Sequence, residues 1–101
     1  MAEMTIAHER TSAGIVASGG EFIATLPGEA ATGSLTYVTR GDVLVAEHTL
    51  VPSSIGGRGV AAALVEALVA HARKDGLKID PQCSYVAAAF KRHPDWADLL
   101  A

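Results

Sequence analysis

The chain has 101 residues, half of them apolar and 19% charged, and its formal net charge is −3. This balance excludes a disordered tail, which combines low hydrophobicity with high net charge, and the length leaves room for a single domain over residues 1–101. Without a broad electropositive surface, we expect no nucleic-acid partner. One cysteine excludes an intramolecular disulfide and a four-cysteine zinc site.

The start of the chain lacks a basic stretch followed by an apolar run, so we expect no signal peptide. The longest apolar stretches are Val43–Ala46, Val60–Val65 and Val86–Phe90. All are far shorter than the roughly 18 residues that span a bilayer. We therefore expect a cytoplasmic chain with no membrane partner, because a reducing compartment suits a lone cysteine.

The first half of the chain predicts a series of strands separated by glycine-containing turns. Alternating or continuous apolar positions indicate strands at Thr5–Glu9, Phe22–Leu26, Ser34–Arg40 and Val43–Val51, with a further short strand at Ile15–Ala17. The connections between successive strands are short, which favours antiparallel neighbours. This half therefore predicts an antiparallel meander.

The second half changes to a helical period. Apolar residues recur at i, i+4 and i+8 from Arg58 to Lys74, which predicts a long helix, and Gly76 follows where a C-cap glycine is typical. Leu77–Asp80 is a short strand candidate, and Ser84–Arg92 a second helix. The predicted fold class is α+β, with strands followed by helix, strand and helix.

The segment joining the two halves, Gly56-Gly57-Arg58-Gly59, leads from the longest strand into the long helix. Glycines permit sharp turns and close approach of a ligand. The first amides of a helix have no internal partner and carry partial positive charge, so they bind anions, phosphate above all. Arg58 would add charge. The alternative interpretation is a plain flexible connection.

Two common phosphate motifs are excluded or disfavoured at this segment. A Walker A loop needs Lys and Ser/Thr after its last glycine, where this chain has Gly59-Val60-Ala61. A dinucleotide fingerprint needs a parallel βαβ unit, whereas the strands expected before this loop are antiparallel.

Four pieces of the sequence carry a resemblance to a known family. They are His48-Thr49-x-Val51-Pro52, Gly57-x-Gly59-x-Ala61, Pro81-x-Cys83-x-Tyr85-Val86 and His93-Pro94. The loop resembles the pyrophosphate loop of the GNAT acetyltransferases, whose motif is Gln/Arg-x-x-Gly-x-Gly/Ala. Over residues 21–100 the chain resembles the minimal, single-domain GNAT-like family of the YjdJ type. One departure is that Gly56 stands at the Gln/Arg position, so binding would depend on backbone amides and Arg58.

The resemblance implies a GNAT-like sheet that is splayed, acetyl-CoA as cofactor, and transfer of an acetyl group to an amine. It places the diphosphate on the loop amides and the pantetheine arm beside the end of the long strand. In the gap before the next strand, a free backbone N–H would stabilise the thioester oxyanion. The residues that would bind the cofactor are Leu50, Val51, Gly56, Gly57, Arg58, Gly59, Val60 and Ala61.

Cys83 is the first catalytic candidate, because it opens the last helix, where free amides lower the pKa of a thiol. The resemblance places it in the cofactor gap, where it would either accept the acetyl group or only polarise the thioester. The alternative is a small buried hydrophobic residue, the commoner role of a single cysteine.

His48 is the second catalytic candidate. Its ordinary pKa near 6.5 suits removal of a proton from an incoming ammonium, directly or through water. The alternative is a histidine satisfied by hydrogen bonds within the sheet. Glu47 is an alternative base, and strict strand alternation would place Glu47 and His48 on opposite faces.

Four other features are given lesser roles. We interpret Tyr85 as a packing residue rather than a proton donor. Lys91 and Arg92 would meet a ribose phosphate or would simply be solvated. His93-Pro94 is read as a helix stop that packs against Trp96. We expect no metal site. His8, His71 and His93 fall on separate segments, and none of them has a second His or Cys at the sequence spacing of metal ligands.

Three functions remain open from the sequence. The favoured one is an N-acetyltransferase acting on an amine of a protein or a small molecule. The second is a non-catalytic module that binds CoA or acyl-CoA, and the third is a partner-binding domain without CoA. We expect a monomer or weak homodimer. So small a chain leaves little surface for an acceptor pocket, which favours either a partner that completes it or a large acceptor.

Overall fold

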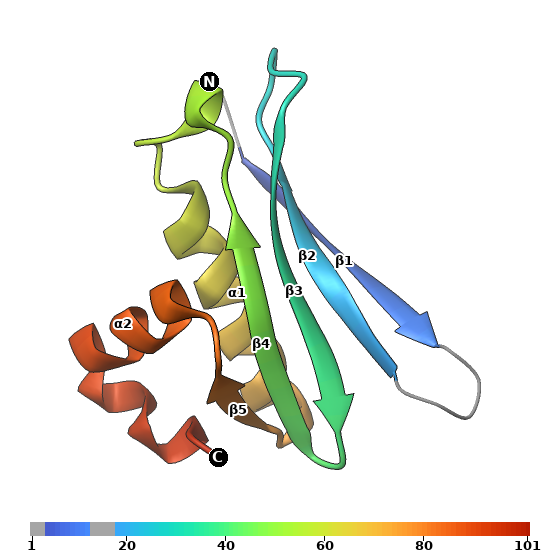
Figure 1. Ribbon diagram of the computed structural model, residues 1–101, viewed down its shortest axis with the longest axis vertical. Coiled ribbons are helices and arrows are strands. Elements are labelled where there is room, and N and C mark those ends of the chain that lie inside the picture. Colours follow the sequence, from blue (N-terminus) through green and yellow to red (C-terminus); the bar gives the residue numbers. More distant parts are fainter. Residues whose placement is uncertain (1–3, 13–17) are drawn as a thin grey trace.

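The computed structural model describes residues 4–12 and 18–101 (Figure 1). It contains a five-stranded sheet in the order β1-β2-β3-β4-β5. The strands are β1 (Thr5–Ser12), β2 (Ser18–Thr25), β3 (Thr32–Arg40), β4 (Val43–Leu50) and β5 (Lys78–Pro81). The first four form the predicted antiparallel meander, and β5 returns parallel to β4 after the long helix.

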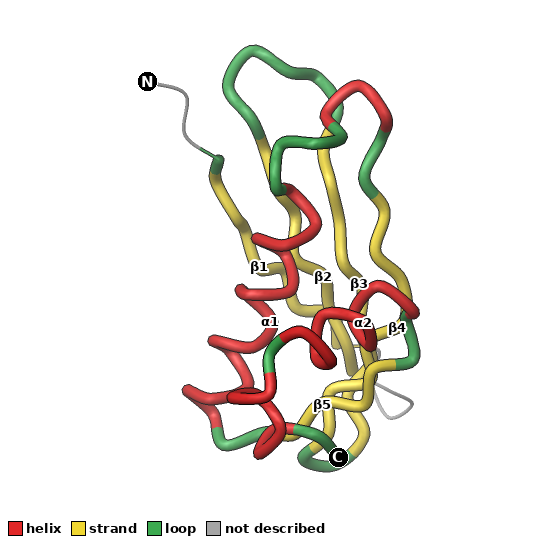
Figure 2. Tube along the Cα trace, turned by 90° about the vertical axis from the view of Figure 1, so that its left-hand side faces the viewer, coloured by secondary structure: helices red, strands yellow, loops and turns green. Residues whose placement is uncertain are grey.

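Two helices and two 3-10 turns complete the fold. They are α1 (Val60–Asp75), α2 (Ser84–Arg92), η1 (Ser53–Ile55) and η2 (Pro94–Leu99). Helix α1 contacts all five strands, and Figure 2 shows the helices gathered on one side of the sheet. Their apolar residues and those of the strands form a core cluster. The predicted α+β class and order of elements are confirmed. Among the described residues, no helix has the length and apolar character needed to cross a membrane.

The sequence pattern predicted most elements correctly, including both ends of α2, but missed the ends of several others. The helix predicted from Arg58 begins at Val60, because Gly59 before it has a left-handed backbone, with φ of 77°. The connection from β4 to the glycine loop also contains the turn η1, which the sequence analysis did not predict. The short strand predicted at Ile15–Ala17 lies outside the described residues.

A β-bulge interrupts the second half of β4. Tyr37 pairs with Ala46, but its neighbour Thr36 pairs with His48, so Glu47 is an extra residue. Because paired residues share a face of a sheet, Ala46 lies on the α1 side with buried Tyr37, and His48 lies on the other side with Thr36. The strict alternation expected for this segment is therefore wrong.

Strands β4 and β5 diverge after four paired residues, as the resemblance implied. Their pairing ends at Ala46 with Pro81, while β4 continues to Leu50. The last link is a hydrogen bond of 2.9 Å in which the N–H of Cys83 donates to the carbonyl of Ala46. Beyond it, no strand in residues 4–12 or 18–101 pairs with this edge of β4, which leaves backbone groups facing the gap.

Candidate functional site

The glycine loop turns the chain from β4 into α1. Gly57 and Gly59 have φ values of 75° and 77°, a region that other residues rarely adopt. A Cβ at either position would meet nothing within 4 Å. These glycines are therefore required by backbone conformation, and the space in front of them is open.

The amides at this end of α1 are free. The first helical hydrogen bond runs from the N–H of Ala63 to the carbonyl of Gly59, at 3.0 Å, and Gly59 provides no side-chain cap. Among the described residues, the N–H groups of residues 57–62 donate to no protein acceptor. With the positive end of the helix dipole added, this loop suits an anion such as a phosphate.

These amides border a cleft of about 330 Å³. Its walls come from the end of β4, the glycine loop, the first turn of α1 and the first turn of α2. The lining residues are Val51, Gly56, Gly57, Gly59, Val60, Ala61, Ala62 and Tyr85. Six of the eight predicted cofactor residues therefore line one cleft.

The two predicted residues outside the lining are Leu50 and Arg58. The Leu50 side chain is exposed, with 65% of its surface accessible. Arg58 forms an ion pair with Glu29, from the connection between β2 and β3, with Nη2 3.3 Å from Oε2. The positive charge expected from Arg58 is thus partly neutralised by the Glu29 carboxylate, which the sequence analysis did not consider.

Cys83 lies across the gap from the end of β4. Its Sγ is 3.3 Å from the Thr49 hydroxyl, which the bulge has shifted onto the α1 side of the sheet opposite Leu35. The thiol is half-buried and packs against the core. It is therefore not a fully buried hydrophobic residue, although it retains a packing role.

The surroundings of Cys83 favour the thiolate. Burial by itself raises the pKa of the thiol, but hydrogen bonding from the Thr49 side chain and from the backbone N–H groups of Val86, Tyr85 and Thr49 outweighs it. The pKa of Cys83 is therefore lowered from its ordinary value, in the direction expected for a thiol at the start of a helix.

His48 and Glu47 are both exposed beside the gap. No hydrogen bond of the His48 side chain occurs within the described residues, so His48 is not a histidine satisfied within the sheet. His48 lies on the opposite side of β4 from Thr49 and Cys83. His48 and Cys83 therefore both lie near the end of β4, but they do not hydrogen-bond to each other.

Tyr85 and Arg92 meet on the flank of the cleft. Tyr85 is half-buried and packs against the core, as predicted, but it also lines the cleft. The Arg92 guanidinium carbon lies 5.9 Å from the centre of the Tyr85 ring, within cation–π range.

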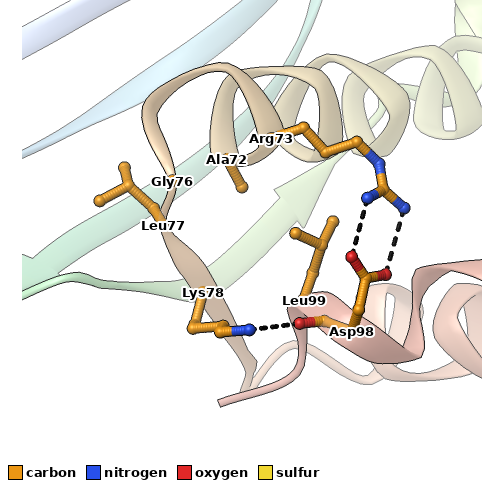
Figure 3. Close-up of a pocket in the computed structure, with 7 residues that line it drawn as sticks. All are labelled: Ala72, Arg73, Gly76, Leu77, Lys78, Asp98 and Leu99. Atoms are coloured by element: carbon orange, nitrogen blue, oxygen red, sulfur yellow. Dashed lines mark hydrogen bonds and ion pairs between the residues drawn. The ribbon is translucent and has the colours of Figure 1, made fainter.

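A second cavity, of about 400 Å³, lies at the opposite end of α1 (Figure 3). Its polar groups already have partners. Arg73 makes two hydrogen bonds to the Asp98 carboxylate, at 2.9 and 3.3 Å, and Lys78 donates to the backbone carbonyl of Asp98. The side chains around this cavity therefore join η2 to α1 and β5. Their charged groups are already paired with one another, so few are left to bind a ligand.

The remaining histidines contact aromatic side chains. His8 and His71 come from separate segments, yet their rings lie 4.6 Å apart, centre to centre. His93 ends α2 and stacks on Trp96 at 3.9 Å, which confirms the predicted stop and packing. In residues 4–12 and 18–101, no three His, Cys, Asp or Glu side chains gather as a metal site would require.

Three residues near the cleft were missed by the sequence analysis as functional candidates. Thr49 contacts the thiol, Glu29 pairs with Arg58, and Gly33 lets α1 approach β3. Only Thr49 carried a signal, as part of the His48-Thr49 motif, whereas the other two depend on contacts between distant segments.

A comparison with protein families identifies the family of the chain. A sequence model of the GCN5-related N-acetyl-transferase family matches residues 21–99. The match confirms the GNAT resemblance, while the closer likeness to the YjdJ type stays a prediction. Because the match covers most of the chain and every element around the cleft, the chain belongs to the GCN5-related N-acetyltransferase family.

Proposed function

We propose that this chain is an acetyl-CoA-dependent N-acetyltransferase whose acceptor is an amine. The observation that supports this most directly is the row of free amides at residues 57–62, all of which except Arg58 line a cleft at the end of β4. A diphosphate fits this row, because its charge would complete hydrogen bonds that the protein leaves unmade. When bound, acetyl-CoA supplies an activated thioester.

The chain's own residues divide the remaining tasks. Gly57, Gly59 and the first turn of α1 would hold the diphosphate, and Val51 would border the pantetheine arm. The N–H of Thr49 hydrogen-bonds the Cys83 thiol, so another backbone N–H on the edge of β4 beyond Ala46 would bond the thioester carbonyl and stabilise its developing negative charge. His48, exposed beside the gap, would take a proton from the acceptor ammonium.

Cys83 admits two routes, which differ in the protonation state of its side chain, and the lowered pKa of the thiol favours the first. In the first, the Cys83 thiolate would attack the thioester carbonyl with departure of the coenzyme A thiolate, and the amine nitrogen would then take the acetyl group with release of the Cys83 thiolate. In the second, the protonated thiol would only polarise the thioester carbonyl, and the amine would attack directly and displace the coenzyme A thiolate. Rapid quenching followed by mass spectrometry separates them, because only the first leaves acetyl on Cys83.

Transfer from labelled acetyl-CoA to polyamines, peptides and histone-like proteins tests the activity. We expect at least one amine class to be acetylated. His48→Ala and Cys83→Ala should slow transfer by about 100-fold or more, the range that a positioned acid–base group typically contributes. Glu47→Gln tests the alternative base, and a loss confined to Glu47→Gln would move the base role away from His48.

The second candidate function is a non-catalytic CoA-binding module. It is favoured by Gly56 at the motif's Gln/Arg position and by the engagement of Arg58 with Glu29. This function predicts shifts of the Gly56–Ala61 amide resonances when CoA is added, without transfer to any amine. Absence of such shifts would contradict both proposals and leave a partner-binding domain.

A further inference from the structure

Strand β1 forms the edge of the sheet opposite β5 (Figure 1). Within residues 4–12 and 18–101 it pairs only with β2, and helix α1 also contacts it. None of the side chains described at positions 5–10 is fully buried, and only Ile6 and His8 are half-buried. The family match starts at residue 21 and therefore leaves β1 out. Strand β1 is thus attached to the rest of the fold through β2, α1 and few buried side chains.

His8 connects β1 to three other elements. Its ring stacks on Phe22 of β2, with the ring centres 4.2 Å apart, and its Nε2 is hydrogen-bonded to the Tyr37 hydroxyl of β3. Tyr37 reaches across β2 at Gly20, where a Cβ would lie 2.8 Å from the hydroxyl oxygen. On the helix side, the rings of His8 and His71 meet edge to face, with 4.6 Å between their centres. His8 therefore joins β1 to β2, β3 and α1 at one place.

The surroundings of the His8–His71 pair disfavour its protonation. Strand β2 contributes only uncharged residues on this side, and the titratable and charged groups around the pair are Arg10 of β1, Tyr37 of β3, and Lys74 and Asp75 of α1. Burial is the main cause that lowers the pKa of both histidines, and Arg10 adds to it. The Asp75 carboxylate acts in the opposite direction, but it lies 3.7 Å from Nη2 of Arg10 as well as from Nδ1 of His71. One carboxylate shared in this way does not neutralise two protonated rings.

We propose that His8 and His71 form a pH-controlled latch that releases β1 from β2 and α1 at mildly acidic pH, while the rest of the sheet stays folded. Protonation of both rings places two positive charges beside each other and beside Arg10, and like charges at this separation repel. Once β1 is released, water solvates both imidazolium groups, and their pKa values return towards 6.5. The released form therefore gains population as the pH falls. The latch does not depend on the proposed acetyl transfer.

Amide hydrogen exchange of the full chain, with each rate corrected for its intrinsic value at the same pH, measures the release. Between about pH 7.5 and about pH 5.5, we expect the protection of the β1 amides that bond to β2 to fall about tenfold or more, because one pH unit below its pKa shifts a freed histidine by about a factor of ten. At the lower pH, these amides should stay about tenfold or more less protected than those shared by β3 and β4, as expected for local opening rather than global unfolding.

Matched variants assign the release to the pair. His8→Phe keeps a ring that can stack on Phe22 but takes up no proton, so it should lose most of the change with pH, whatever its protection at neutral pH. His71→Gln tests the pair from the helix and should reduce the change as well. His48→Gln removes an exposed histidine on the opposite side of the sheet and should behave as the wild-type chain.

Four results would overturn the inference. The β1 amides could lack protection at neutral pH, or keep it unchanged at the lower pH. They could exchange as slowly as the β3 and β4 amides at both pH values, which would show that only the whole fold opens. Finally, either variant of the pair could retain the full wild-type change, which would assign the pH dependence to other groups.

Discussion

The Thr49 hydroxyl is the side-chain group that most favours the Cys83 thiolate. Thr49→Val keeps the shape of the side chain and removes its hydrogen bond, so the pKa of Cys83 should rise. The rate of alkylation by iodoacetamide near neutral pH should fall about fivefold, corresponding to roughly 1 kcal/mol for one hydrogen bond.

Thr49→Ser is the matched control for this prediction, because it keeps the hydroxyl and should alkylate at nearly the wild-type rate. The full pH profile of alkylation distinguishes an altered pKa from altered access. A profile that keeps its midpoint in Thr49→Val would show that the backbone amides alone set the state of the thiol.

Glu29 places a negative charge next to the proposed diphosphate site and occupies Arg58, whose side chain is 50% exposed. Glu29→Gln removes that charge and frees the guanidinium. Coenzyme A should then bind up to about fivefold more tightly at low ionic strength, the range of an exposed ion pair. Calorimetric titration measures the change, which should vanish near 1 M salt, where the screening length is about 3 Å.

Arg58→Gln provides the opposite control and should weaken binding. If Glu29→Gln also weakens binding, Glu29 holds Arg58 in a productive position rather than competing for it.

Gly33 fixes how closely α1 approaches the sheet. A Cβ at Gly33 would lie 2.6 Å from Cγ1 of Val60 and 3.4 Å from Cδ1 of Leu64. Val60 is the first residue of α1 and also lines the cleft. A small residue in β3 therefore sets the position of the proposed anion site, although it does not touch the cleft.

Gly33→Val should displace the start of α1, because the added side chain would clash with Val60, whose β-branched side chain has few alternative rotamers in a helix. We expect a loss of about 1–3 kcal/mol in the free energy of unfolding, as for other overpacked cores. Coenzyme A binding should weaken as well. Chemical denaturation and calorimetric titration measure the two effects.

Thr32→Val adds no bulk, lies on the same strand and is exposed, so it should change neither quantity. A Gly33→Val variant that is destabilised but binds coenzyme A normally would show that the loop adjusts independently of α1.

At the scale of the whole molecule, one aromatic cluster joins three strands to α1. His8 stacks on Phe22 at 4.2 Å, hydrogen-bonds the Tyr37 hydroxyl and meets the edge of His71. Burial lowers the pKa of both histidines from 6.5, with help from nearby cations, while Asp75 opposes the shift. The folded chain therefore keeps both rings neutral at pH values where the unfolded chain protonates them.

The sign of the resulting pH dependence follows from proton binding. Because the folded pKa values lie below 6.5, the unfolded chain binds more protons as pH falls below 6.5, and the fold loses stability. The free energy of unfolding by urea should be lower at about pH 5.5 than at about pH 7.5, on either side of the ordinary histidine pKa.

The double variant His8→Gln/His71→Gln should lose less stability over the same interval, whatever its absolute stability. The exposed His48→Gln is the control and should keep the wild-type dependence. An equal loss in the double variant would assign the pH dependence to other groups.

The match between sequence and structure was best where the information is local. The i, i+4 stripe predicted α1, the short turns predicted the meander, and three closely spaced glycines located the loop whose amides are free. Each of these features depends on residues within a few positions of one another, so periodicity and backbone preference were sufficient.

The tertiary structure alone decided how distant residues combine. The bulge at Glu47 moved Thr49 onto the α1 side and His48 off it, the connection after β2 brought Glu29 to Arg58, and the fold paired His8 with His71. Strand register and helix placement set these contacts, and both depend on packing over the whole sheet. The sequence determined the elements, the glycine loop and the family resemblance, whereas the surroundings of each candidate group arose only when the chain folded.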